Sequence, residues 1–171
     1  MKLELGAFEK RPGWHTIDKD PRSDYPCDLR FPLPFPDECI EAIYSSHFLE
    51  HLPHNGIIQI LRECYRVLKT GYSFEAAVPN ARIYIDRYYM KDPPKIPDTD
   101  LYPPAFHYYS KIDFINYFAY LDGHHQFLFD EENLPLIVAS VGFRLVKLRP
   151  FKEGLDMQAR DHESIYVEAY K

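Results

Sequence analysis

"CIEAIYSSHFLEHL", residues 39–52, joins a strand-like run to a group of ionisable side chains. Residues 39–45 are mostly apolar and contain β-branched isoleucines, which is typical of a buried strand. His47, Glu50 and His51 follow directly. In open α/β sheets, ligands bind just outside the carboxyl ends of the strands. This stretch therefore predicts a strand with a functional site at its end.

The spacing His47-x-x-Glu50-His51 also matches the inverzincin pattern, in which two histidines bind zinc. Such a site needs a helix long enough to hold both histidines, and a distant carboxylate as third ligand. Pro53 ends any helix within two residues of His51, and the sequence marks out no distant glutamate. We therefore expect no metal site here, and a zinc hydrolase is the least favoured of three functional hypotheses.

Strand-like and helix-like segments alternate on both sides of this stretch. Strands are expected at residues 2–6, 14–18, 39–45, 72–79, 143–148 and 163–170. Helices are expected at 55–70, with Asn55 as N-cap and Gly71 beyond the end, at 111–121, and between Asp130 and Gly142. This alternation predicts an α/β fold, a Rossmann-like three-layer sandwich with a mostly parallel sheet. Because no helix separates the last two strands, the C-terminal strand should be antiparallel.

Aromatic and proline residues concentrate at about residues 80–126, where the signals for regular structure are weak. We interpret this region as an insertion in a single domain that spans residues 1–171. His107 and the pair His124-His125 lie within it. These histidines are candidates for the lining of a substrate pocket.

The composition excludes several classes of protein. A formal net charge of −6 argues against a general binder of nucleic acids or anionic membranes. No apolar run approaches the roughly 20 residues of a membrane span. The three cysteines form no CxxC pair, and no signal peptide is evident at Met1. We therefore expect a cytoplasmic protein in a reducing compartment.

Five stretches carry a resemblance to a known family. They are "LELGAFEKRPGWHTIDKDP" (3–21), "CDLRFPLPFPDECIEAIYSSHFLEHL" (27–52), "ILRECYRVLKTGYSFEAAVPN" (60–80), "HHQFLFDEENLPLIVASVGF" (124–143) and "ESIYVEAYK" (163–171). In this order they resemble class I S-adenosylmethionine-dependent methyltransferases of the short, type 11-like branch. The resemblance implies S-adenosylmethionine as cofactor, and it implies that the segment around His47 and Glu50 binds no metal.

The resemblance also implies which acids and neighbours contact the cofactor. Asp18, at the tip of the second strand, would accept hydrogen bonds from the two ribose hydroxyls, as acids do in dinucleotide folds. Asp28, with the Leu29 backbone, would contact the adenine. The alternatives are that Asp18 only opens the turn formed by Asp20 and Pro21, and that Asp28 is a solvated loop acid.

Gly6 and Glu4 match the first cofactor loop of the family. A glycine suits this position because the backbone must approach the ligand closely. The family pattern continues as G-x-G, whereas Phe8 stands at the second glycine position in this chain. The short connection to the second strand also leaves no room for the usual helix.

Ser45 and His47 lie at the carboxyl end of the strand expected at residues 39–45, where the resemblance places the cofactor and the acceptor. Ser45 is a candidate for cofactor binding. His47 is the candidate general base, since the protein need only align the acceptor and remove a proton from an oxygen nucleophile. The alternative is a histidine that bonds a nearby backbone group.

Two functional hypotheses remain beside the zinc hydrolase. The first is methyl transfer from S-adenosylmethionine to a small-molecule or glycan-like acceptor. The second is a methyltransferase-like fold that no longer catalyses and acts as a binding or assembly module, which Phe8 and the short first connection favour. Homo-oligomer formation is compatible with both.

Overall fold

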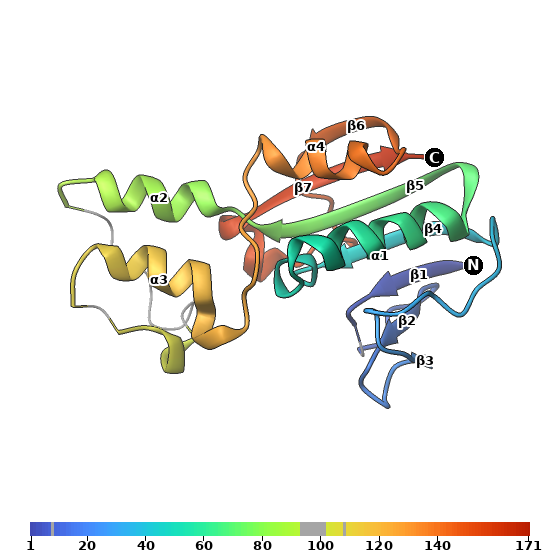
Figure 1. Cartoon of the computed structure of the whole chain (residues 1–171), viewed down its shortest axis with the longest axis horizontal. Coiled ribbons are helices and arrows are strands. Elements are labelled where there is room, and N and C mark those ends of the chain that lie inside the picture. Colours follow the sequence, from blue (N-terminus) through green and yellow to red (C-terminus); the bar gives the residue numbers. More distant parts are fainter. Residues whose placement is uncertain (8, 93–101, 108) are drawn as a thin grey trace.

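The computed structural model of the chain describes residues 1–7, 9–92, 102–107 and 109–171 (Figure 1). Phe8, the departure from the G-x-G pattern, lies outside the described residues. The strands are β1 (Lys2–Leu5), β2 (His15–Asp18), β3 (Tyr25–Pro26), β4 (Ile40–Ser46), β5 (Leu68–Pro79), β6 (Arg144–Arg149) and β7 (Ser164–Tyr170). The helices are α1 (His54–Val67), α2 (Ala81–Tyr89), α3 (Ile112–Tyr120) and α4 (Asn133–Ser140). Short 3-10 turns cover Leu49–His51, Pro103–Ala105, Leu121–Gly123 and Gln158–Glu163.

Within these residues the strands form one seven-stranded sheet in the order β3-β2-β1-β4-β5-β7-β6. Strands β1 to β5 pair in parallel, whereas β7 runs antiparallel between β5 and β6. The predicted Rossmann-like class and the antiparallel C-terminal strand are confirmed. The strand order reverses between β1 and β4, so a crevice opens beyond the carboxyl ends of these two strands.

Helices α1 and α4 pack on the same face of the sheet (Figure 1). Helix α1 buries Ile57, Ile60, Leu61 and Cys64, which repeat at helical spacing as the sequence predicted. The helix begins after Pro53 and has no side-chain cap, so Asn55 is not the N-cap. It also ends three residues earlier than expected, because residues 68–71 extend β5 through the pairing of Leu68 with Ile40.

The opposite face of the sheet is charged. Glu75 and Glu168 lie directly opposite each other on β5 and β7. Lys152 bridges them, with its Nζ 2.7 Å from the first carboxylate and 3.0 Å from the second. In the described part of the chain, irregular segments at 9–14 and 150–157 provide the layer on this face, where a three-layer fold usually has helices.

This charged layer should make the fold sensitive to acid. Burial alone would raise the pKa of Glu168, but the ammonium groups of Lys147 and Lys152 outweigh it and lower the pKa to about 2. The stabilisation is therefore complete above about pH 4.5 and is lost as the pH falls toward about 2. We expect the melting temperature of Glu168→Gln to fall less steeply than that of the wild type between these pH values. Equal slopes would contradict this role of Glu168.

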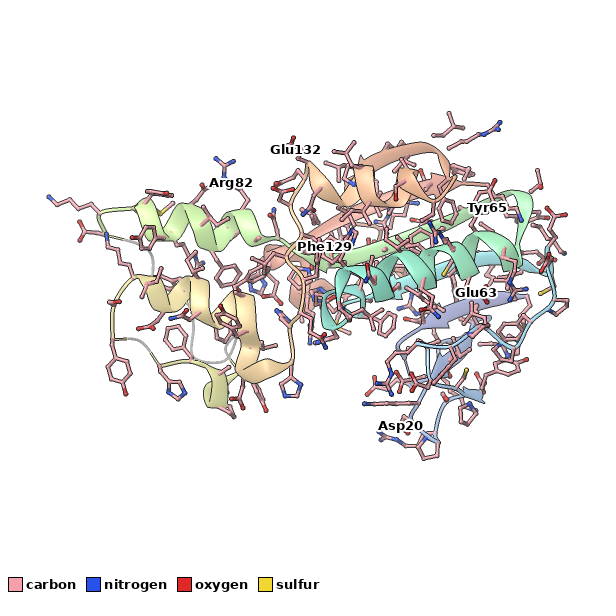
Figure 2. All side chains as sticks on the ribbon, viewed as in Figure 1. Asp20, Glu63, Tyr65, Arg82, Phe129 and Glu132 are labelled. Carbon is pink, nitrogen blue, oxygen red and sulfur yellow. The ribbon has the colours of Figure 1, made fainter. Side chains whose placement is uncertain are left out.

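Helices α2 and α3 form a separate small layer beyond the carboxyl end of β5 (Figure 1). They share a second apolar cluster, in which the rings of Tyr84 and Phe118 stack at 4.6 Å. Helix α3 confirms the helix expected at 111–121, whereas α2 was not predicted. Fully buried Phe129, on the segment that leads back to α4, accepts a hydrogen bond from the Ala81 amide and ties this layer to the sheet (Figure 2). No helix in the described residues is both long enough and apolar enough for a membrane span.

Candidate active site

A cavity of about 530 Å³ opens at the crevice beyond β1, β2 and β4, and we call it the switch-point cavity. Four predicted cofactor residues line it: Gly6, Asp18, Asp28 and Leu29. The predicted base His47 and the predicted pocket histidine His124 also line it. The sequence did not indicate the other lining residues, which are Lys19, Arg30, Phe48, His51, Leu52, Gly123 and Gln126. Its size is in the range of ordinary ligand pockets.

The two acids of this cavity are each held by a local turn. Asp18 Oδ1 accepts a hydrogen bond from the Asp20 amide at 2.7 Å. Asp18 therefore opens the turn that contains Asp20, and it also lines the cavity. Asp28 pairs with Arg30 through both carboxylate oxygens. Its hydrogen bonds from Arg30 lower the pKa of Asp28 to about 2. Both acids thus have a fixed place at the rim of the cavity.

Glu4 and Ser45 do not line this cavity, although the resemblance implied cofactor contact for both. Side chains alternate between the two faces of a sheet. Glu4 points to the charged face, where it pairs with Arg11 at 3.2 Å. Ser45 is completely buried between Leu5 and Ala76 of the neighbouring strands. Both side chains lie outside the lining of the cavity, and cofactor contact by either residue stays a prediction.

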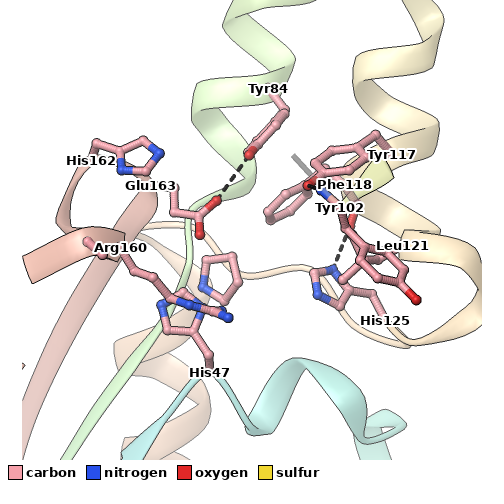
Figure 3. Close-up of a pocket in the computed structure, with 12 residues that line it drawn as sticks. His47, Tyr84, Tyr102, Tyr117, Phe118, Leu121, His125, Arg160, His162 and Glu163 are labelled. Atoms are coloured by element: carbon pink, nitrogen blue, oxygen red, sulfur yellow. Dashed lines mark hydrogen bonds between the residues drawn. The ribbon is translucent and has the colours of Figure 1, made fainter. Parts of the chain in front are cut away.

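A second cavity of about 370 Å³ lies between the sheet and the α2–α3 layer, and we call it the insertion cavity (Figure 3). The insertion and the turn before β7 supply most of its walls, and its lining residues are His47, Pro79, Tyr84, Tyr102, Tyr117, Phe118, Leu121, His125, Ala159, Arg160, His162 and Glu163. The predicted pocket histidines divide: His124 lines the switch-point cavity and His125 the insertion cavity. His107 is exposed and lines neither.

His47 lines both cavities. Its backbone is left-handed, with φ of 49°, which is uncommon for a residue other than glycine and turns the chain sharply at the end of β4. Its Nε2 lies 2.8 Å from Ser164 Oγ, which itself donates to the Arg160 carbonyl. Nε2 therefore carries the proton and Nδ1 keeps its lone pair. Burial lowers the pKa of His47 to about 3, so the ring is neutral at physiological pH.

A family model and solved structures both match this chain, and both agree with the family that its sequence resembles. A family model described as "Methyltransferase domain" matches residues 18–74, one third of the chain. No curated protein matches.

Solved structures match nearly the whole chain. A SAM-dependent methyltransferase from Archaeoglobus fulgidus is 17% identical with a TM-score of 0.55, over 99% of this chain and 85% of the other. One from Mesorhizobium loti is 13% identical with a TM-score of 0.60, over 99% and 90%. Phosphoethanolamine N-methyltransferase 2 from Haemonchus contortus, solved with S-adenosyl-L-methionine, is 11% identical with a TM-score of 0.59, over 99% and 48%.

At such identities the structural matches establish the fold, and the family model adds the sequence of the segment from β2 to β5. The strand order and the switch-point cavity agree with both. The chain therefore has a class I S-adenosylmethionine-dependent methyltransferase fold, and the resemblance drawn from its sequence is confirmed. The cofactor of this class is S-adenosylmethionine.

Proposed function

We propose that the chain binds S-adenosylmethionine in the switch-point cavity and catalyses methyl transfer to a small-molecule or glycan-like acceptor in the insertion cavity. One observation carries the proposal: His47 forms part of the wall of both cavities. Methyl transfer requires donor and acceptor to meet end to end, and adjoining cavities with a shared wall provide that arrangement.

The residues of the switch-point cavity suit the cofactor. Asp18 offers a carboxylate at the end of β2 for a ribose diol, and Asp28 and Leu29 lie at the adjoining wall. Gly6 brings bare backbone to the same cavity, with φ of 69°. The bound cofactor would supply a methyl group on a sulfonium, which is a good leaving group.

We propose His47 as the residue that receives the acceptor proton. The ring is neutral and Nδ1 has a free lone pair, so it can accept a proton, and its pKa of about 3 makes it a weaker base than an ordinary histidine. The aromatic wall of the insertion cavity, which includes Tyr84 and Tyr117, can stack on the face of a sugar or another planar group. Tyr84 is held in place by its hydrogen bond to Glu163 at 3.2 Å.

Asp18→Ala should weaken the binding of S-adenosylhomocysteine by about 10- to 100-fold, because hydrogen bonds to a charged group contribute about 1.5–3 kcal/mol each. Isothermal titration calorimetry with S-adenosylmethionine and S-adenosylhomocysteine measures this directly. Asp20→Asn is the matched control, since Asp20 belongs to the same turn but does not line the cavity. Equal affinity of the wild type and Asp18→Ala would remove Asp18 from the cofactor site.

The alternative is a binding module that does not catalyse. Phe48 favours it, because its ring lies against Gly6 at the point where the cofactor backbone contact is expected. The described residues between β1 and β2 also contain no helix. A wild-type protein that binds neither ligand up to millimolar concentration would contradict methyl transfer and make the binding module the leading hypothesis.

A further inference from the structure

Three potential metal ligands meet between the two cavities. One ligand atom each from Glu50, His51 and His125 lies within 4.8 Å of the other two. Glu50 is 2% exposed, and neither of its carboxylate oxygens has a hydrogen-bond partner. A buried carboxylate without a partner is costly and rare, so Glu50 either keeps its proton or faces a cation.

Hydrogen bonds orient both histidines for ligation. Nδ1 of His51 lies 2.8 Å from the carbonyl oxygen of His124, and Nδ1 of His125 lies 2.7 Å from that of Phe118. A carbonyl oxygen only accepts, so both Nδ1 atoms carry the proton and both Nε2 atoms keep a lone pair. Nε2 of His51 is 3.8 Å from Glu50 Oε1. Metal-binding histidines typically donate their second nitrogen to a carbonyl in this way.

We propose that Glu50, His51 and His125 bind a divalent first-row transition metal. Two imidazoles and one carboxylate suit zinc or ferrous iron, and three protein ligands leave a coordination position open for a substrate. Ligand atoms on one tetrahedral zinc lie about 3.3 Å apart, so small rotations of the three side chains would close the site. His51 is partly exposed and opens to the switch-point cavity, which gives the metal a route of entry.

The ligands of this site differ from those of the inverzincin pattern that the sequence matches. In that pattern His47 and His51 would share the metal, whereas His47 Nε2 is engaged with Ser164. His125 takes its place, from the segment that returns from the insertion. The expectation of no metal was argued against the first arrangement and from the family resemblance, and the second arrangement departs from that expectation.

The position of the site suggests what the metal would do. His51 lines the switch-point cavity and His125 the insertion cavity, so the metal would lie where donor and acceptor meet. A hydroxyl oxygen at the open position would lose its proton more readily, which favours an oxygen acceptor. This last step rests on the proposed function, whereas the metal site does not. The exposed Arg160 side chain, which lines the insertion cavity, opposes a cation but can turn into solvent.

The test uses the full chain freed of metal by a chelator and then dialysed. Calorimetry with Zn²⁺ alone, and visible absorption with Co²⁺ alone, should show one equivalent bound at micromolar affinity or tighter. Glu50→Gln and His125→Asn should each weaken Zn²⁺ binding at least tenfold. The asparagine amide can still donate to the Phe118 carbonyl but lacks the ligating nitrogen. His107→Ala, an exposed histidine of the same insertion, should bind like the wild type.

Thermal melts separate ligation from folding. Without metal, Glu50→Gln should melt at or above the wild-type temperature, because it removes a buried carboxylate that has no partner. The rise in melting temperature caused by Zn²⁺ should disappear in this variant. Absence of stoichiometric binding, or binding that neither substitution weakens, would overturn the site. If the chain binds Zn²⁺ but does not bind S-adenosylhomocysteine, the result supports the metal site and contradicts the proposed methyl transfer.

Discussion

Asp156→Ala is expected to lower the free energy of unfolding by about 3–5 kcal/mol, because it breaks a buried ion pair and leaves Arg149 with Glu75 as its remaining carboxylate partner. Asp156 has no exposed side-chain surface, and the side chain of its partner Arg149 is 3% exposed. The carboxylate accepts two hydrogen bonds from Arg149, at 2.6 and 2.8 Å. It also accepts one from the buried Tyr44 hydroxyl at 2.9 Å and one from the Lys152 amide at 2.6 Å.

This carboxylate joins the segment at 150–157 to β4 and β6, so its loss should loosen the layer that replaces helices on the charged face. Denaturation with urea, followed by circular dichroism, measures the change. Asp37→Ala is the matched control, because Asp37 also pairs with an arginine, Arg66, but is 73% exposed. Its effect should stay below about 1 kcal/mol. If both variants lose the same amount, the buried pair contributes no more than a surface pair.

Local sequence patterns predicted the strands of the main sheet and the helices that pack on it, because each of these elements has its own hydrophobic periodicity. The apolar spacing of Ile57, Ile60 and Leu61 indicates α1 without any knowledge of its neighbours. The end of that helix depends on tertiary pairing, since Leu68 joins β5 opposite Ile40. Helix α2 escaped prediction because its burial depends on a partner, and Tyr84 is covered only when α3 packs on it.

The candidate site was predictable to the extent that strand ends define it. Asp18 and His47 follow strands whose carboxyl ends meet at one edge, so their proximity to the cavities follows from the topology. The family motif predicted Glu4 at the cofactor site. The alternation of side chains along β1 instead directs Glu4 to the charged face of the sheet, where it pairs with Arg11. The meeting of Glu50 and His125 depends on the path of the insertion, which no spacing in the sequence encodes.

Gly6→Ala is expected to lower the free energy of unfolding by about 2–5 kcal/mol and to weaken S-adenosylhomocysteine binding. At a φ of 69° an L-residue costs about 1–2 kcal/mol. An added Cβ would also lie 2.6 Å from Phe48 Cγ, which forces the ring to move and adds roughly 1–3 kcal/mol. Because Phe48 lines the switch-point cavity, the displaced ring would reshape the cofactor site.

Gly13→Ala isolates the contribution of Phe48. Gly13 has a φ of 80°, but a Cβ there would meet no atom within 4 Å, so only the backbone cost of about 1–2 kcal/mol applies. Urea denaturation and calorimetry of both variants then separate backbone strain from the ring contact. A larger loss for Gly6→Ala, accompanied by weaker binding, would mean that Phe48 is fixed against the cofactor loop. Equal losses with unchanged binding would mean that the ring yields freely, and the argument that Phe48 closes the pocket would fail with it.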